Sequence, residues 1–412
     1  MKLQNLRIEH LGFEEVALIA DVESVKFGKN TIWVSVSKEY ESWLCTSRYD
    51  GFLVALLYPA MVYGEDIEIN GTVSKRLLRN INKYAQDILM AYNAKLRRIS
   101  ITAKEVSSEI FKTAKHIGTG FSGGVDSFST IYNNFANEND EEYKIDTLFN
   151  FNVGAHGRYL GTTSNGMDSG KLRQLRKEFL KQYTDSIGLP FISVDSNIHF
   201  YHDEWRHLHT QLLTIVSPVL AVSQNLRKYY IASVGLNYDK WINVATEERF
   251  ISLAGFCEPY LLPLLSTEST ELICDGMQHT RVQKTLQLID YEPTKRFLNV
   301  CDTREPQKKN CGICVKCGRV GLTLSIVNKL NEYTEVFDIE QFKKKEFHLW
   351  GDAFIKYNSD FFMSDIIDFA KEKGYKTPPY FALFMYGILL KIIRKLFSKN
   401  SRTKLRKLLK MP

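Results

Sequence analysis

Short apolar runs separated by Gly, Asn and Asp fill the first hundred residues, a pattern typical of strands joined by turns. A helix is predicted from about Ser74 to Asn93, because its apolar residues recur at helical spacing. Together these elements predict a small α+β module over residues 1–105, in which we find no chemical motif. The predicted strands are EEVALIADV (14–22), NTIWVSVS (30–37), DGFLVALLYPAMV (50–62) and EDIEING (65–71).

The pattern changes near residue 110, where apolar strands begin to alternate with helical stretches. Such alternation predicts an α/β fold over residues 106–335, with a parallel, doubly wound sheet covered by helices on both faces. In such sheets, ligands bind beyond the carboxyl ends of the strands. Residues 336–412 are predicted to form a peripheral helical region. The predicted strands are HIGTGF (116–121), KIDTLFNFNV (144–153), LPFISVDS (189–196) and KYYIASVGL (228–236), with helices near 127–136, 169–187 and 205–225.

Charge is distributed unevenly along the 412 residues. The net charge is +7, and the stretch from Lys391 to the end carries nine Lys or Arg and no acid, which leaves the body at 7 − 9 = −2. Basicity therefore argues nothing about nucleic acid for the body of the chain. The tail has apolar residues interleaved with its basic ones, so it could bind an anionic membrane surface or RNA, or form an ordinary surface helix.

The ends and the cysteines bear on the cellular compartment. The first residues, MKLQNLRIEHLGFEE, carry acids where a signal peptide would have an apolar run. No uninterrupted apolar stretch reaches the roughly 18 residues of a membrane-spanning helix. Seven cysteines without a secretory signal predict reduced thiols and a metal site in place of a disulfide framework. We expect a cytoplasmic protein, and a homodimer is one possible assembly.

The stretch GTGFSGGVDSFST (118–130) allows two interpretations of its glycines. The spacing of Gly118, Gly120 and Gly123 is that of a dinucleotide-binding turn, but the next strand should then end in an acid. That strand instead ends with Asn150 and Asn152. A Walker-type loop would need a Lys before its Ser or Thr, and none is present.

The second half of the stretch, SGGVDS, has the chemistry of a pyrophosphate-binding loop. Gly123 and Gly124 allow backbone N–H groups to approach phosphate oxygens, and the following helix contributes its dipole. Ser122 and Ser127 can donate hydroxyl hydrogen bonds. Asp126 would repel phosphate, so its expected role is to hold Mg²⁺. The loop predicts cleavage of ATP between its α and β phosphates, and an incidental glycine turn is the structural alternative.

Four cysteines form a second motif, CDTREPQKKNCGICVKC. Nine, two and two residues separate Cys301, Cys311, Cys314 and Cys317, and four thiolates complete a closed tetrahedral site typical of structural zinc. The loop containing Lys308 and Lys309 is expected to lower the thiol pKa values. A redox pair would leave two cysteines unexplained, and an iron–sulfur cluster held by three cysteines is the main alternative to a zinc knuckle.

SGGVDS after a strand is the signature of the PP-loop ATP pyrophosphatases, and in this respect the chain resembles that superfamily, whose fold is the adenine nucleotide alpha hydrolase type. A PP-loop followed by this cysteine spacing looks like 7-cyano-7-deazaguanine synthase and its diverged relatives, over residues 115 to 325. Those enzymes activate a carboxylate with ATP, add ammonia to give an amide, and activate again to form a nitrile. The resemblance implies the same type of chemistry here.

The match is looser outside these two motifs. Gly154 and His156 fall where the family has a tyrosine-glycine-glutamine-arginine-histidine stretch, and Gly235 and Asn237 fall in its Gly-x-Asn loop. The tyrosine and glutamine of the first stretch are absent, and so is the family's proline-aspartate-cysteine-arginine stretch. Because those segments line the substrate pocket in the family, the resemblance extends to the ATP half and leaves the acceptor open.

We therefore expect an ATP-dependent ligase of the C–N bond-forming type that releases AMP and pyrophosphate, with ATP, Mg²⁺ and Zn²⁺ as cofactors. Ammonia would arrive free or from a partner. The alternatives are a tRNA-thiolating enzyme with a sulfur donor and a non-catalytic nucleotide-binding scaffold. Diverged relatives with this layout suggest a bacterial defence or surface-polysaccharide pathway. The predicted catalytic residues are Ser122, Asp126 and Ser127, and the nucleotide site adds Gly123, Gly124, Val125, His156, Gly235, Asn237 and Arg281.

Two weaker signals lie near the third strand of the α/β region. NIHFYHDEWRHLHT concentrates four histidines with Asp203 and Glu204, which allows a second metal site, although a polar loop entering a helix is the simpler interpretation. Asp195 ends that strand and could contact Mg²⁺ or ribose.

Overall fold

A ten-stranded sheet organises the larger of two compact units in the computed structural model. The structure describes residues 1–154, 169–202, 207–244, 258–301 and 305–379. Unit 1 comprises Met1–Ser122 and Thr130–Gln278, and unit 2 comprises Gly123–Ser129 and His279–Pro412. This division differs from the predicted boundaries at residues 105 and 335.

One half of the unit 1 sheet is entirely parallel, in the order β10-β9-β6-β7-β8. The chain runs outward from β6 to β7 and β8, then returns to the other side of β6 to form β9 and β10. The strand order therefore reverses at β6. These strands are β6 (His116–Gly120), β7 (Thr147–Phe151), β8 (Phe191–Ser196), β9 (Leu226–Ala232) and β10 (Glu271–Asp275).

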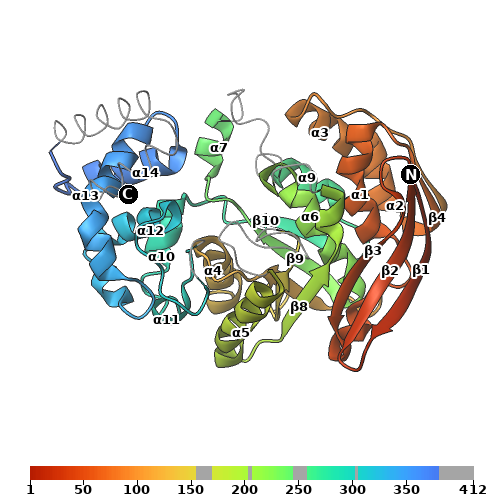
Figure 1. The fold of residues 1–412 in the computed structure, drawn as a ribbon, viewed down its shortest axis with the longest axis horizontal. Helices are drawn as coiled ribbons and strands as arrows, with labels where there is room; N and C mark the ends of the chain where they lie inside the picture. Colours follow the sequence, from red (N-terminus) through yellow and green to blue (C-terminus); the bar gives the residue numbers. More distant parts are fainter. Residues whose placement is uncertain (155–168, 203–206, 245–257, 302–304, 380–412) are drawn as a thin grey trace. The chain divides into compact units, whose positions relative to one another are not determined.

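The other half of the sheet is mixed and comes from the first 107 residues. Strand β3 pairs antiparallel with β8, where Val34 lies opposite Ser196 and Ser35 opposite Asp195. This pairing makes one sheet of the predicted N-terminal module and the α/β region, and so explains why no unit boundary falls at residue 105. The strands are β1 (Lys2–Leu11), β2 (Glu15–Ser24), β3 (Gly28–Ser37), β4 (Ile67–Ser74) and β5 (Ile101–Ser107), seen at the right of Figure 1.

Helix α1 (Asp50–Tyr63) occupies the segment that we predicted as a strand, so that prediction was wrong. Nearly every residue of α1 is buried, and an apolar run buried on all sides carries no period that would separate helix from strand. The helix packs against α6 (His207–Ala221) so closely that a Cβ on Gly51 would lie 2.6 Å from the carbonyl oxygen of Ser217.

The remaining helices of unit 1 follow the predicted alternation. Residues 74–93 are helical as predicted, with one π turn in the middle. Helices α5 and α6 lie on opposite faces of the parallel strands, as expected for right-handed crossovers in both directions (Figure 1). The elements are α2 (Lys75–Asn80), the π turn (Ile81–Ala85), α3 (Gln86–Tyr92), α5 (Ser169–Ile187), α7 (Tyr238–Val244) and α9 (Glu258–Leu265), with short 3-10 turns at Lys38–Trp43, Ile198–His202 and Ser223–Asn225.

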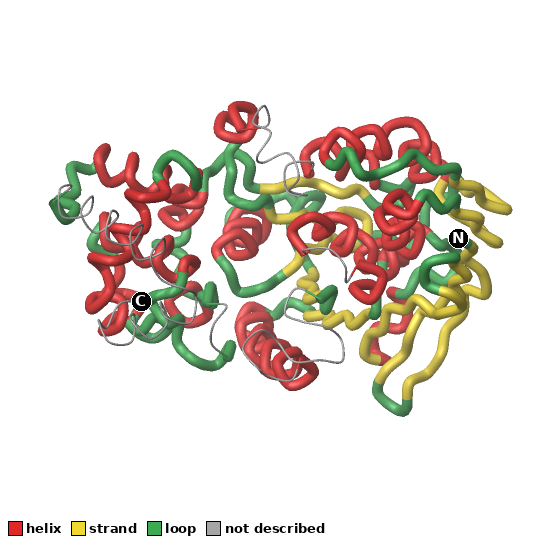
Figure 2. The backbone as a smooth tube through the Cα atoms, turned by 45° about the horizontal axis from the view of Figure 1, so that its top comes forward, coloured by secondary structure: helices red, strands yellow, loops and turns green. Residues whose placement is uncertain are grey.

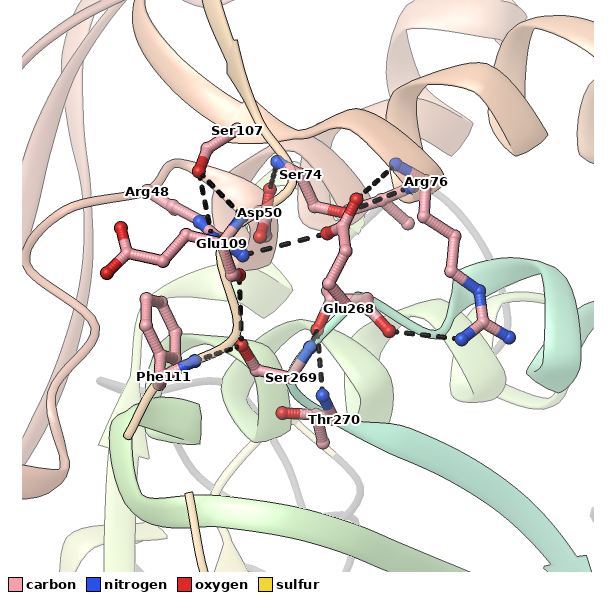
Figure 3. A network of polar contacts seen from close by, with 12 residues as sticks. Arg48, Asp50, Ser74, Arg76, Ser107, Glu109, Phe111, Glu268, Ser269 and Thr270 are labelled. Atoms are coloured by element: carbon pink, nitrogen blue, oxygen red, sulfur yellow. Dashed lines mark hydrogen bonds and ion pairs between the residues drawn. The ribbon is translucent and has the colours of Figure 1, made fainter. Parts of the chain in front are cut away.

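A buried polar network joins distant segments of unit 1 (Figure 3). The Nη2 atom of Arg48 donates to Ser107 Oγ at 3.1 Å and to the Glu109 carbonyl at 2.5 Å, and its Nη1 lies 3.7 Å from Glu268. Asp50 accepts the backbone N–H of Ser74 at 2.7 Å. Because four parts of the chain meet here, the network fixes the N-terminal segments onto the sheet region.

Unit 2 is helical, as the tube view in Figure 2 makes plain. Helix α12 lies against α10, α13 and α14. The ring of Phe342 packs so tightly on α12 that a Cβ on Gly321 would meet it at 2.4 Å. The predicted helices after residue 336 are confirmed by α13 and α14, while residues 380–412, with the basic tail, lie outside the described residues. The elements are α10 (Arg281–Gln287), α11 (Thr294–Phe297), α12 (Val315–Ile326), a 3-10 turn (Leu330–Tyr333), α13 (Ile339–Lys356) and α14 (Phe361–Glu372).

Candidate nucleotide site and metal site

The glycine loop directly follows β6 and leads into α4 (Val125–Ile131). Gly123 adopts a φ of +77°, a left-handed conformation that favours glycine, and its carbonyl accepts the backbone N–H of Asn299 at 2.7 Å. The first helical hydrogen bond runs from Phe128 N–H to the Gly124 carbonyl, which also accepts the Ser127 hydroxyl at 3.0 Å. Ser122 is exposed, Gly124 is half-buried, and the loop is therefore not sealed inside the fold.

Asp126 is surrounded by cationic side chains from α10. Its Oδ2 lies 2.5 Å from Arg281 Nη2, and its Oδ1 lies 3.5 Å from Lys284 Nζ. Lys284 is fully buried, whereas the Asp126 side chain keeps 24% of its exposure. The Oδ1 atom is buried and accepts no hydrogen bond from the described residues, although it lies within ion-pair distance of Lys284. Asp126 thus pairs with Arg281 through one oxygen and with Lys284 through the other.

Local capping positions the two cations. Thr280 begins α10 as a capping box, in which its side chain accepts the N–H of Gln283 while the Gln283 side chain accepts the N–H of Thr280. Arg281 and Lys284 are three residues apart on α10, so both project from the same face. From the sequence we proposed Arg281 as a phosphate contact and expected Lys284 to be solvated, whereas the structure buries Lys284. The sequence offers little indication that Lys284 is buried, because a single Lys in a helix is usually solvated.

A second ion pair extends this cluster within unit 2. Arg319 on α12 pairs with Asp360 at 2.8 Å, and its guanidinium lies 4.1 Å from the ring centre of Phe362. Arg281 lies 5.2 Å from the same ring. Burial lowers the pKa of Arg319, an effect that the charge of Asp360 opposes. The ring of Phe362 therefore lies against two guanidinium groups, of which one pairs with Asp126 and the other with Asp360.

The four predicted cysteines meet in unit 2, with all their Sγ atoms within 4.8 Å of one another. The Sγ atoms of Cys311 and Cys317 are 3.8 Å apart. The Cys311 sulfur accepts the Cys314 N–H, and the Cys314 sulfur accepts the Cys317 N–H at the start of α12. These distances and the buried setting suit one metal ion held by four sulfurs.

The thiol pKa values are raised, whereas the sequence predicted that nearby lysines would lower them. Contacts with Cys301 and then Cys311 raise the pKa of Cys314 and that of Cys317. The two lysines expected to lower these pKa values have other partners, since Lys308 pairs with Glu305 at 3.0 Å and Lys309 donates to the Thr334 carbonyl. Four crowded thiols resist ionisation by themselves, and a bound cation is what would favour their thiolate forms.

Asn310 supports the metal site and was not predicted. Its Oδ1 accepts the backbone N–H groups of Val300 and Cys301, and its Nδ2 donates to the carbonyls of Leu298 and Val336. Only 1% of Asn310 is exposed. The side chain therefore fixes the strand-like segment that carries Cys301, in the way that hydrogen bonds around a metal site orient its ligands. No sequence motif marks an Asn in this role.

Polar residues at the carboxyl ends of β7 and β8 meet in unit 1. Asn152 Nδ2 donates to Asp195 Oδ1 at 2.8 Å, and Arg173 Nη1 lies 2.5 Å from the other carboxylate oxygen. Asn150 donates to the Phe121 carbonyl, just before the glycine loop. Burial raises the pKa of Asp195, and Arg173 opposes that effect. Arg173 was not among the predicted site residues.

The other predicted site residues are separate from these clusters or outside the described part of the chain. Gly235 is buried with a φ of +84°, and Asn237 caps α7 by accepting the N–H of Lys240. His156 lies outside the described residues. Of the histidine-rich stretch, His199 and His202 are buried, and the latter contacts the Ala55 carbonyl at 2.7 Å, while Asp203 and Glu204 are not described.

Comparison with protein-family models, with curated proteins and with solved structures finds no match for the chain. None of the helices in the described ranges combines the length and apolar character needed to cross a bilayer. The fold and the two sites are therefore interpreted on their own geometry.

Proposed function

We propose that the protein is an ATP-dependent synthetase of the PP-loop pyrophosphatase type, which adenylates a carboxylate or carbonyl oxygen and releases pyrophosphate. One observation carries this proposal. The loop SGGVDS follows β6, the strand at which the parallel sheet reverses its order. In open α/β sheets, ligands bind outside the carboxyl ends of the strands at such a switch point.

The loop and α10 supply groups of the kind that a triphosphate needs. Backbone N–H groups at Gly123 and Gly124 and the hydroxyl of Ser122 can face phosphate oxygens. Arg281 and Lys284 bring two positive charges to Asp126 within the same unit. Asp126 Oδ1, buried without a hydrogen bond, fits a role as a magnesium ligand. When bound, Mg²⁺ would neutralise charge on the pyrophosphate.

The reaction that we propose consists of two displacement steps. The acceptor oxygen attacks the α-phosphorus of ATP, the bond to the bridging β oxygen breaks, and pyrophosphate leaves with the electron pair. A nitrogen nucleophile, ammonia in the simplest case, then displaces AMP and gives up a proton to solvent. Preorganised positive charge at Arg281 and Lys284 would stabilise the departing pyrophosphate, which is the main contribution a protein makes to such a step.

We propose zinc for the four-cysteine site, in a structural role. A closed set of four sulfurs leaves no open position for catalysis. The fourth thiol, Cys301, is buried and lies within 4.8 Å of the other three, which favours zinc over an iron–sulfur cluster held by three cysteines. Asn299, two residues before it, donates to the Gly123 carbonyl, so the metal would hold one wall of the glycine loop.

A non-catalytic nucleotide-binding scaffold is the second candidate, and one observation favours it. Asp126 is already paired with Arg281 at 2.5 Å, as a carboxylate would be if it served only to fix the loop. A tRNA-thiolating enzyme would share the loop but use a sulfur donor in place of ammonia. The basic tail, as a contact for a membrane or RNA, remains a prediction because it lies outside the described residues.

The proposal is tested by following ATP labelled at the α-phosphate. The purified protein is incubated with Mg²⁺, ammonia and a small-molecule extract as the source of acceptor. We expect labelled AMP together with pyrophosphate, and loss of both in Asp126→Asn. The control is Asp185→Asn, which makes the same change at an exposed position. Labelled ADP without AMP would contradict the proposal, and AMP formation unaffected by Asp126→Asn would contradict the assigned site.

A further inference from the structure

The inward face of α5 carries two arginines near its beginning. Leu180, Tyr183 and Thr184 form the buried stripe of this helix, and the Tyr183 ring lies 4.7 Å from the ring of Phe121 at the end of β6. Counting back in steps of three and four residues from Leu180 places Arg176 and Arg173 on the same stripe. Both arginines therefore face the sheet near the carboxyl ends of its strands.

The two arginines differ in their partners. Arg173 pairs with Asp195, and Asn152 satisfies the second oxygen of that carboxylate. Asp195 is 3% exposed, so its charge is matched inside the protein by Arg173 and is not left to repel an approaching anion.

Arg176 has no such partner within the described part of the chain. Its Nε is buried and donates no hydrogen bond. Burial alone lowers its pKa, to about 10, without an opposing contribution from any acid. The residue as a whole is only partly buried. A buried charge without a counter-charge is costly to fold, and a ligand that supplied the charge would offset that cost.

We propose that Arg176 binds an oxyanion, a phosphate or carboxylate group of a substrate, at the carboxyl ends of β7 and β8. The planar guanidinium matches the two oxygens of either group, and Arg173 fixes the adjoining turn of α5 through Asp195. The proposal concerns unit 1 alone and does not depend on ATP cleavage. Two sources share this chemistry, the nucleotide and the acceptor.

The test compares wild type with Arg176→Gln by calorimetric titration and thermal unfolding of the full chain. Three probes are used separately: MgATP, inorganic phosphate and acetate. We expect at least one probe to bind wild type and to raise its unfolding temperature by about 3 °C at saturating concentration. Arg176→Gln should weaken that binding tenfold or more. The protein without ligand should unfold at the same or a higher temperature, because the uncompensated charge is gone.

The matched control is Lys181→Gln, which removes one positive charge from the exposed face of the same helix and should leave binding unchanged. Weakened MgATP binding in Arg176→Gln assigns the oxyanion to the nucleotide. Unchanged MgATP binding with lost acetate or phosphate binding assigns it to the acceptor. The proposal is overturned if no probe binds wild type, if Arg176→Gln binds all probes as wild type does, or if its only effect is a lower unfolding temperature.

Discussion

The Arg48 network and the Asp126 cluster are two buried groups of charges with different settings. Arg48 is 3% exposed and is held by Ser107, Glu109 and Glu268, all within unit 1. Asp126 retains 24% exposure and lies on a loop that begins with the exposed Ser122. Burial of charge is common to both, so it does not mark a functional site by itself. Asp126 differs from Arg48 in lying on the loop that follows β6 and in retaining partial exposure.

The largest effect is expected from the metal site. Cys314→Ser removes one of the four proposed ligands, and because a structural zinc would contribute about 10 kcal/mol or more to folding, we expect loss of the metal and unfolding of unit 2. Unit 1, with the Arg48 network, should keep its own unfolding transition. Metal content and two-step thermal unfolding check this. Cys45→Ser, a buried thiol in unit 1, should keep the metal. Full metal content in Cys314→Ser would refute the assigned ligand set.

The next effect in size is expected at Arg48. Arg48→Met leaves Glu268, which is 14% exposed, without the counter-charge of Arg48 and frees the acceptors on Ser107 and Glu109. Breaking a buried pair costs about 3–5 kcal/mol. Urea unfolding measures the loss, and MgATP binding per folded molecule should not change. If Arg48→Met weakened MgATP binding as strongly as a loop variant, the contrast between the two clusters would fail.

Asp126→Asn should have the opposite outcome to Arg48→Met, with a large loss of activity and a smaller loss of stability. We expect AMP formation to fall by about 100-fold, equivalent to about 2.7 kcal/mol, while the unfolding free energy falls by less. The smaller loss of stability follows from the partial exposure of this carboxylate. Initial rates with labelled ATP and urea unfolding of the same samples give both numbers. A variant that lost stability without losing rate would place Asp126 with Arg48, as a structural residue.

The change in unfolding free energy expected for one unit of pH is the smallest of these effects. Burial raises the pKa of Asp50 to about 7, well above its usual 3.8. Between these values the folded protein holds a proton that the unfolded chain has released. This contribution to stability is therefore complete below pH 3.8 and is lost as the pH rises to about 7. The slope is at most about 1.4 kcal/mol per pH unit. Unfolding from pH 5 to pH 8 in wild type and Asp50→Asn measures it, and identical slopes would contradict the assignment.

Local chemistry made several features predictable from sequence. The cysteine spacing predicted a four-sulfur cluster, and the apolar runs gave β2, β3, β4 and β6 to β9 near their observed limits. Strand β1 was missed because KLQNLRIEHL carries many polar residues. Strands β5 and β10 were also missed, because ITAKEVS carries Lys and Glu in its interior and ELICD has only three apolar residues between two acids.

Contacts between segments far apart in the chain could not be predicted from the sequence. The pairing of Val34 with Ser196 joins segments more than 150 residues apart through two residue pairs, and no local pattern encodes it. Burial of Lys284 and of Arg176 Nε depends on which helix faces pack together, since the same residues on a solvent face would look identical in sequence. The position of the glycine loop between a strand and a helix was predictable, because glycines favour a turn after an apolar strand.

The most direct test of the claim that residues 122–127 cradle the triphosphate of ATP is a crystal structure with Mg²⁺ and α,β-methylene-ATP. We expect phosphate oxygens within hydrogen-bond distance of the backbone N–H groups of Gly123 and Gly124 and of the hydroxyl of Ser122 or Ser127. An analogue bound at full occupancy elsewhere, with this loop empty, would contradict the claim.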